Sequence, residues 1–306
     1  MRTTSHAIGT IYYPDEICFA FNPTYIKITG CSSTSVTTTV ATTAGKSHQQ
    51  ISMVYSNTCV INIARTLQLL FDTYNIVNAR ALGINVSVQA GSSTFGFHTV
   101  AIWGNIAPGE VFNGARTVRW FMNYPMTISI FTGDAFEEKP LSLSVRYDTS
   151  PWDYTFDHTF RARLTEEIDV VGDERKDGLF LRWIDRHGML QFWLFEKGVK
   201  EIKNDDSGNE LTMNYVDQSG NSFRSIKRQQ SFFSTNTQYL CATNVNAEEY
   251  TMLESILTSP VIDLYHPDSA GWEPVIIVNT TTKRDVKVLQ DFECRIALPN
   301  VNAQSL

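Results

Sequence analysis

Hydrophobic and polar residues alternate over short stretches along most of this chain, and this period is typical of β-strands with one buried face. Residues 84–90 and 94–104 flank a Gly-Ser-Ser turn and predict a hairpin. Residues 35–55 predict a second, threonine-rich hairpin around Ala44-Gly45-Lys46. Two short strands interrupted at Asn22-Pro23 are expected within 16–30. Further strands are predicted over 116–121, 126–131, 141–147, 232–244, 260–266, 272–279 and 291–299.

The stretch 179–198 departs from this alternation. Two apolar runs flank Arg186-His187-Gly188, which predicts a hairpin with a three-residue loop and Gly188 in the left-handed conformation. Both faces are apolar in either register, whereas a hairpin with one face in water should alternate. We therefore expect one face to pack in its own domain and the other to be covered by a second sheet, a neighbouring domain or another subunit. The candidate interface residues are Leu181, Trp183, Trp193 and Phe195.

Two stretches predict short helices instead of strands. The first is 62–71, with Asn62 as the expected N-cap. The second begins at Asn246, where Glu249 three residues later predicts a capping box, and it ends before Pro260. The expected buried stripes are Ile63, Leu67 and Leu70 in the first helix and Tyr250, Leu253 and Leu257 in the second.

A change of composition divides the chain. Residues 148–178 mix proline, aspartate and opposing charges with only short apolar pieces, and predict a connecting segment that carries one or two strands. The expected architecture is therefore an N-terminal β domain over 1–147 and a C-terminal β-sandwich-like domain over 179–306. The fold class is mostly β, with two β-sandwich-like domains that each contain one short α-helix.

Composition narrows the class of protein. The 306 residues are 42% hydrophobic and 19% charged, which indicates a globular chain. The net charge of −7 disfavours a nucleic-acid partner. The five cysteines are scattered without zinc-site spacing, so we expect reduced thiols and synthesis in the cytoplasm. The N-terminus lacks the organisation of a signal peptide, and no apolar run is long enough to predict insertion into a membrane.

Local motifs for catalysis are absent from the sequence. It contains no phosphate-binding glycine loop, HExxH, GxSxG or EF-hand pattern. Two groups place a histidine near carboxylates, and polar loops or solvated strands explain both more simply than metal or acid–base sites. These groups are Asp263, His266 and Asp268, and Asp153, Asp157 and His158. We therefore predict no enzymatic activity, no cofactor and no metal.

Two alternatives stay open. A glycoside hydrolase would take its paired carboxylates from separate strands and leave no local motif. A carbohydrate-binding or adhesin module would instead use exposed aromatic rings to bind a glycan. The tryptophans near predicted strand ends, which could form such a platform or fill the ends of a sandwich, are Trp103, Trp120, Trp152 and Trp272.

Several stretches of the chain resemble structural proteins of phage and prophage tails. In the C-terminal part these are WIDRHG (183–188) with FWLFEKG (192–198), and GWEPV (271–275) with LQDFECRIALP (289–299). The N-terminal part contributes Trp103-Gly104, Phe112-Asn113, RTVRWF (116–121) and Tyr124-Pro125. These motifs are strand patterns spread over most of the chain.

The resemblance implies a tail-tip or baseplate component similar to distal tail proteins. Such proteins pair an oligomerising β domain with a peripheral β-sandwich and form rings around the tail axis. The implied partners are copies of the same chain and other tail proteins, and the implied location is a virion tail or tail-like particle assembled after synthesis in the bacterial cytoplasm. The family brings no catalytic residue. Distal tail proteins often carry large insertions for carbohydrate binding, and no such insertion is evident here.

Overall fold

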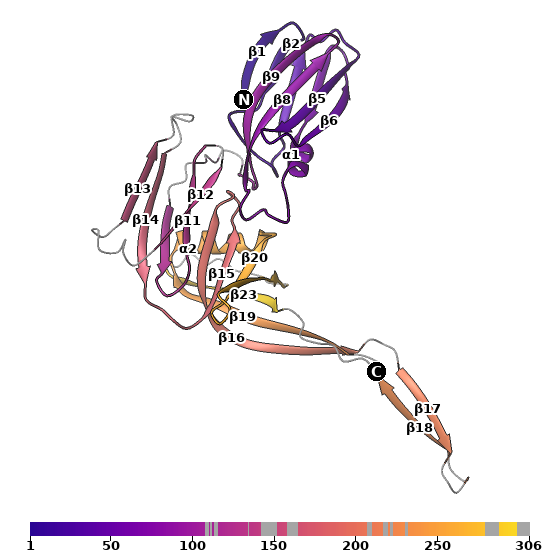
Figure 1. The fold of residues 1–306 in the computed structure, drawn as a ribbon, viewed down its shortest axis with the longest axis vertical. Coiled ribbons are helices and arrows are strands. Elements are labelled where there is room, and N and C mark those ends of the chain that lie inside the picture. Colours follow the sequence, from indigo (N-terminus) through magenta and orange to yellow (C-terminus); the bar gives the residue numbers. More distant parts are fainter. Residues whose placement is uncertain are drawn as a thin grey trace. The chain divides into compact units, whose positions relative to one another are not determined.

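The computed structural model describes residues 1–107, 110, 112, 116–133, 135–141, 152–157, 165–206, 210–216, 220, 223–229, 232–278 and 288–298. Strands account for 59% of the structure and helices for 8%, which confirms the mostly-β fold (Figure 1). The chain divides into two compact units. Unit 1 comprises 1–176, 182–193 and 258–261, and unit 2 comprises 177–181, 194–257 and 262–306.

Unit 1 begins with a β-sandwich. Its first sheet has the order β1-β2-β4-β7, and its second has the order β3-β9-β8-β5-β6. Buried residues alternate along β4 and β5, as the sequence pattern predicts. Tyr13 of β2 contacts Phe95 and Phe97 of β9, with ring centroids 5.3 and 5.0 Å away, and so joins the two sheets. The strands are β1 Arg2–His6, β2 Gly9–Tyr13, β3 Ile17–Phe19, β4 Tyr25–Thr29, β5 Ser35–Thr42, β6 Ser47–Met53, β7 Thr58–Asn62, β8 Ala81–Ala90 and β9 Ser93–Ile102.

The helix of this sandwich, α1 (Ala64–Leu70), is shorter than predicted. Its N-cap is Ile63, with no side-chain cap hydrogen bond, so the assignment of Asn62 as N-cap is wrong. The Asn62 carboxamide oxygen accepts hydrogen bonds from the backbone N–H groups of Thr24 and Ala64 at 3.2 and 3.1 Å. Asn62 is the last residue of β7, and its side chain fastens the strand-to-helix connection to the start of β4.

The remainder of unit 1 includes strands from the segment 148–178. Strand β14 (Thr165–Asp173) pairs in parallel with β10 (Arg116–Phe121) and antiparallel with β13 (Trp152–Asp157). Residues 148–178 thus contain two strands, within the one or two strands that the sequence predicts for this segment, and both lie in unit 1. β11 (Thr127–Phe131) and β12 (Phe136–Pro140) form a separate hairpin. The strand predicted over 141–147 lies, apart from Leu141, outside the described residues.

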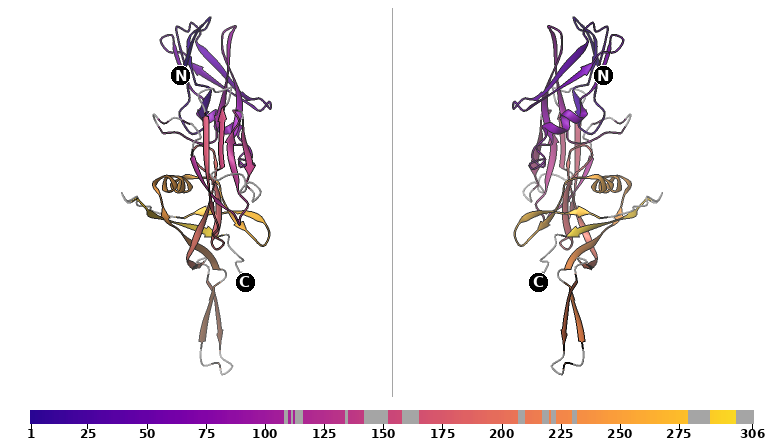
Figure 2. Two further views of the ribbon diagram at one scale, coloured as in Figure 1. Left: turned by 90° about the vertical axis from the view of Figure 1, so that its left-hand side faces the viewer. Right: turned by 90° about the vertical axis from the view of Figure 1, so that its right-hand side faces the viewer.

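Unit 2 is built on a seven-stranded sheet with the order β21-β20-β15-β16-β19-β23-β22 (Figures 1 and 2). The helix α2 (Ala247–Glu254) follows β19 and has the predicted capping box between Asn246 and Glu249. A short 3-10 helix covers Ser255–Thr258, before Pro260. The strands are β15 Leu179–Ile184, β16 Leu190–Asp206, β17 Glu210–Val216, β18 Phe223–Gln229, β19 Phe232–Val245, β20 Ile262–His266, β21 Gly271–Pro274, β22 Ile276–Ile277 and β23 Gln290–Leu298.

The hairpin 179–198 has the predicted turn. The backbone N–H of Asp185 donates to the carbonyl of Met189 at 2.8 Å, which leaves a loop of three residues, and Gly188 has φ of +80°. Hairpin residues 179–181 and 194–198 fall in unit 2, and 182–193 fall in unit 1. Among the helices of the described residues, none is both long and apolar enough to cross a membrane.

Candidate functional site

The four candidate interface residues of the hairpin are buried within the single chain. Leu181, Trp183 and Phe195 are 0% exposed, and Trp193 is 1% exposed. Within unit 1, Phe121 packs edge-on against Trp193 with centroids 5.4 Å apart. Both apolar faces are thus covered intramolecularly, which is one of the outcomes expected from the sequence. The four residues have no exposed surface in this conformation.

The tip of this hairpin carries a small charged cluster in unit 1. Glu110 accepts hydrogen bonds from Arg186 at 2.7 Å and lies 2.9 Å from Nε2 of His187. Burial alone would raise the pKa of Glu110, but the Ala107 N–H and the charges of His187 and Arg186 together hold that pKa below its usual value. The His187 ring also lies against Phe112 at 5.8 Å, so this histidine does more than complete a turn.

We expect this cluster to make unit 1 sensitive to acid. A carboxyl whose pKa is lower in the folded state stabilises that state above its unfolded pKa, and this contribution is lost as the pH falls through the folded pKa. The free energy of unfolding of the Glu110→Gln variant should therefore lie below that of the wild type near neutral pH. The difference should shrink as the pH falls below about 4, the region where glutamate titrates. Urea titrations at a series of pH values would measure it, and a pH-independent difference would contradict the role of the Glu110 charge.

The histidine–carboxylate group around His266 does not form the arrangement that a metal site needs. His266 lies 2.6 Å from Glu273 on the neighbouring strand β21, so its carboxylate contact is a residue that the sequence analysis did not single out. No group of three or more potential ligands for a metal ion occurs in the part of the chain that the structure describes. His158 and the side chains of Asp153 and Asp157 lie outside the described residues.

Of the four candidate platform tryptophans, the three whose side chains the structure describes are buried or half-buried. Trp103 and Trp120 are only 9% and 6% exposed. Trp272 is half-buried and packs against Tyr265 and Phe180 in unit 2, at 5.2 and 5.8 Å between centroids. The side chain of Trp152 lies outside the described residues.

All five cysteines are free thiols. Burial together with nearby carboxylates raises the pKa of Cys241 to about 11, so this thiol is protonated and a poor nucleophile at neutral pH.

Unit 2 contains an extended ribbon, which we define as residues 196–206 of β16, 232–241 of β19 and the hairpin β17–β18. Strand β23 pairs with β19 only from Asn236 onward, so within the described residues 203–206 and 232–235 pair only with each other. The hairpin β17–β18 is likewise a two-stranded sheet of its own. Figure 2 shows the ribbon leaving the seven-stranded sheet. Two-stranded antiparallel sheets are marginally stable in water without further packing.

The base of the ribbon is fixed to the sheet. A register shift between Lys197 and Lys200 marks a β-bulge, where the Gln238 side chain donates to the carbonyl of Gly198 at 2.7 Å. A Cβ atom at Gly198 would lie only 2.9 Å from Cβ of Tyr239, so the two strands need glycine at this point. Arg295 of β23 binds Glu201 and stacks over the Tyr239 ring at 4.8 Å.

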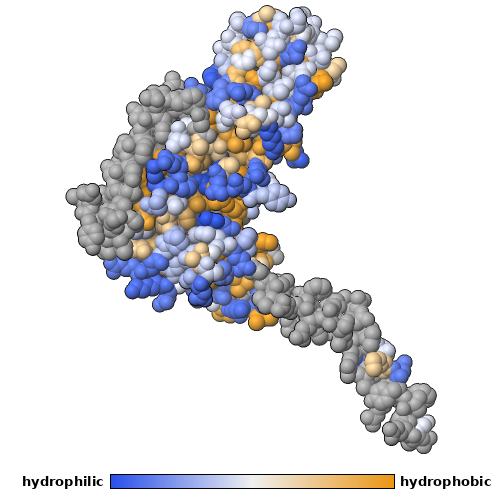
Figure 3. Space-filling view, in the orientation of Figure 1, coloured by the Kyte–Doolittle hydropathy of each residue, from blue (hydrophilic) through white to orange (hydrophobic). Residues whose placement is uncertain are grey.

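Apolar side chains on the ribbon remain exposed. Val199 and Ile202 are 68% and 62% exposed, and Met213 and Tyr239 are 48% and 39% exposed. Hydrophobic residues reach the surface where the ribbon leaves the sheet (Figure 3). The sequence analysis did not identify this surface, although residues 196–203 do show apolar residues between charges, which is the pattern of an exposed strand.

Comparison with known proteins finds no protein-family model that matches this chain, and no curated protein is similar to it.

Proposed function

We propose that this protein is a structural subunit of a phage or prophage tail tip or baseplate, and that it acts by assembling with copies of itself and with other tail proteins. It would be made in the bacterial cytoplasm and incorporated into a virion tail or tail-like particle. The assignment to tails draws on the resemblance of its strand motifs to distal tail proteins. The assignment to assembly draws on the ribbon of unit 2.

The ribbon is the observation that carries this proposal. It holds two long strands in register by backbone pairing while Val199, Ile202 and Met213 stay largely in contact with water. Exposed apolar residues on a long, two-stranded element are costly for a lone soluble chain, because such an edge invites pairing with other strands. A partner that covers the ribbon would remove this cost and would give the two-stranded sheet β17–β18 a surface to pack against.

Deleting the outer part of the ribbon tests the proposal. Asp206 and Phe232 are paired in register, so residues 207–231 can be replaced by an Asn-Gly turn without breaking the pairing of β16 with β19. We expect the full chain to sediment as a homo-oligomer and to form rings in negative-stain images. The shortened chain should stay folded, because α2 and the seven-stranded sheet are unchanged, and it should sediment as a monomer because the outer part of the ribbon is gone. A full chain that stays at the 34.6 kDa of one copy at every concentration would contradict the proposal.

A pair of triple variants separates a specific surface from general hydrophobicity. Val199→Ser, Ile202→Ser and Met213→Ser together change the ribbon. The control changes three exposed apolar residues on or beside the edge strand β6, whose exposed fractions of 57–76% are on average higher than the 48–68% of the ribbon residues, namely Ile51→Ser, Met53→Ser and Tyr55→Ser. We expect the ribbon variant to weaken association by at least about tenfold, equivalent to about 1.4 kcal/mol, and the control to leave it unchanged. Equal effects of the two variants would argue against the ribbon as the assembly surface.

A further inference from the structure

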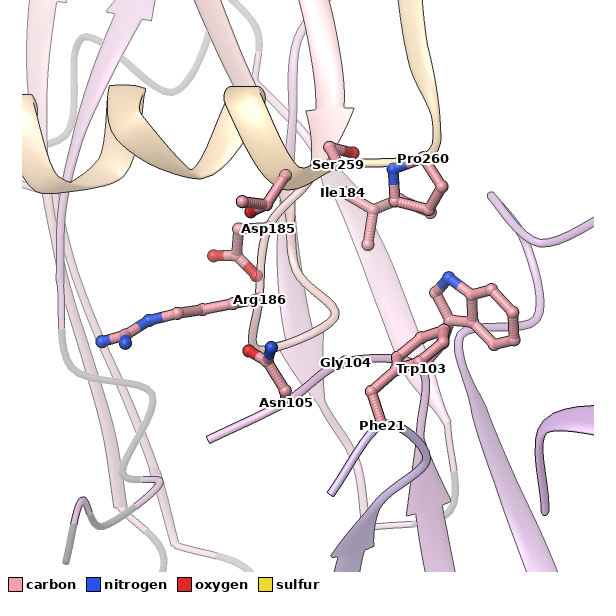
Figure 4. Close-up of a pocket in the computed structure, with 10 residues that line it drawn as sticks. Phe21, Trp103, Gly104, Asn105, Ile184, Asp185, Arg186, Ser259 and Pro260 are labelled. Carbon is pink, nitrogen blue, oxygen red and sulfur yellow. The ribbon is translucent and has the colours of Figure 1, made fainter. Parts of the chain in front are cut away.

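A cavity in unit 1 has the character of a binding site and is separate from the ribbon. Its volume is about 450 Å³, within the range of small-molecule pockets. Four segments that are distant in the sequence line it (Figure 4): Phe21, Trp103–Asn105, Ile184–Arg186 and Thr258–Pro260. We propose that this cavity binds a neutral, hydroxylated ring of the pyranose sugar class.

The backbone around the cavity is held in place before any ligand arrives. The N–H of Phe21 donates to the carbonyl of Gly104 at 3.0 Å, and the N–H of Asn105 donates to the carbonyl of Arg186 at 2.7 Å. A Cβ atom at Gly104 would lie only 2.2 Å from that Arg186 carbonyl oxygen, so this close approach requires glycine. A preorganised frame of this kind lowers the entropy that binding must offset.

Aromatic rings form one wall of the cavity. Phe21 meets Trp103 edge-to-face, with centroids 4.7 Å apart and planes at 77°. Trp103 also packs on Phe71 at 5.1 Å, which holds the indole in one orientation. Phe21 is 46% exposed, so a large part of its surface stays available beside the cavity. The C–H face of a pyranose ring is apolar and can stack on such a surface, while its rim of hydroxyl groups can reach polar atoms.

Polar atoms that could bind the hydroxyl groups of a ligand complete the site. Trp103 is 9% exposed, and its indole N–H has no hydrogen-bond partner among the described residues. Figure 4 shows this nitrogen on the edge of the indole that faces Ile184 and Pro260. A buried indole N–H usually has an acceptor, and a ligand oxygen would provide one. The side-chain amide of Asn105 lines the same cavity and is exposed, and it offers both a donor and an acceptor to a hydroxyl group.

The charged residues of the lining are already neutralised. The Asp185 carboxylate accepts hydrogen bonds from the N–H groups of His187 and Met189 at 2.9 and 2.8 Å and from the Gln191 side chain at 2.8 Å. Arg186 pairs with Glu110 at 2.7 Å. Both charged groups are already bound by neighbouring residues and are not available to pair with a charged ligand, so the ligand is expected to be neutral.

Nuclear magnetic resonance on the ¹⁵N-labelled full chain tests this inference through the Trp103 indole N–H signal, which the Trp103→Phe variant assigns. The probes are methyl glucoside, methyl galactoside and N-acetylglucosamine, with glucuronate and cyclohexanol for comparison. We expect at least one neutral sugar to shift the signal in a saturable way in the millimolar range, and to do so more strongly than glucuronate or cyclohexanol. If the Trp103→Phe variant does not fold, the perturbation of this signal by Phe21→Ala provides the assignment.

Two variants and a control locate the binding. Phe21→Ala and Asn105→Ala should each weaken sugar binding by about tenfold or more, and Tyr74→Ala, which changes a fully exposed aromatic residue, should not. The inference is overturned if no neutral sugar gives a saturable shift, which would mean that water alone fills the cavity, or if cyclohexanol binds better than every sugar. Sedimentation of the same variants reports assembly independently, so failure of sugar binding leaves the proposed function unaffected.

Discussion

Replacing Arg80 by methionine is expected to destabilise unit 1 by about 3–5 kcal/mol, the usual cost of removing one partner from a buried ion pair. The Arg80 side chain is 1% exposed and forms an ion pair with Glu138. Its Nε donates to the carbonyl of Gly188 at 2.8 Å, and its Nη2 donates to the Ser129 hydroxyl at 3.2 Å. One guanidinium therefore fastens the tip of the hairpin 179–198 to the β11–β12 hairpin.

The loss of stability on replacing Arg80 should exceed the loss of the ion pair alone, because its partners Glu138 and Ser129 form further hydrogen bonds within the same network. The Glu138 carboxylate also accepts hydrogen bonds from Ser129 at 2.8 Å and Thr127 at 2.7 Å, and the Ser129 hydroxyl accepts one from the Leu190 N–H at 2.9 Å. Methionine preserves much of the volume of the arginine stem, so the measured change reports the lost polar contacts more than a cavity.

Arg186→Met is the matched control for this prediction. Arg186 pairs with Glu110 at 2.7 Å, but its side chain is 40% exposed, so its removal should cost at most about 1 kcal/mol. Urea unfolding followed by tryptophan fluorescence would give both values. If the two variants lose similar amounts of stability, the Arg80 network stabilises unit 1 no more than an exposed ion pair does.

Local signals predicted the local structure of this chain well. Alternation identified β5, β8, β9 and β10, and the Asn246–Glu249 capping box appears as expected. The local sequence predicts Asn62 as an N-cap, but its side chain binds two backbone N–H groups from different elements, one of them outside the helix. Nothing in the sequence near Arg80 indicates burial, because three of its four partners, Ser129, Glu138 and Gly188, are 49 to 108 residues away along the chain.

Long-range pairing was the part that the sequence pattern could not specify. The charged segment that contains β14 looks like a linker, yet it pairs in parallel with β10 more than 40 residues earlier. The cavity also depends on long-range contacts, because its walls come from four separate segments. Among its lining residues, the sequence suggests only Trp103 as a ligand-binding residue. The composition of 179–198 did show that both faces of the hairpin must be covered, and it could not distinguish cover by the same chain from cover by a second one.

Replacing Trp193 by alanine is expected to destabilise the protein by about 3–5 kcal/mol, the range for removing a large aromatic residue from a core. Trp193 is 1% exposed, packs edge-on against Phe121, and lies under the Arg119 guanidinium at 5.1 Å. A cavity of this size cannot be filled by small shifts, because the ring is enclosed by residues of separate strands. Thermal unfolding and urea titration would measure the loss, and Val171→Ala, at an apolar residue that is 52% exposed, is the control.

The consequence for assembly distinguishes Trp193 from the ribbon. If the hairpin is covered within one chain, folded Trp193→Ala protein should associate with the same affinity as the wild type, because the lost contacts are intramolecular. The ribbon variant should show the reverse, with weaker association and a free energy of unfolding of the monomer within about 1 kcal/mol of the wild type, since its altered side chains are exposed. Sedimentation measures the association of each variant, and urea unfolding measures its free energy of unfolding. Weaker association of folded Trp193→Ala protein would show that the hairpin contributes to the subunit interface. It would also imply that the chain opens before it assembles, because Trp193 is buried in the single chain.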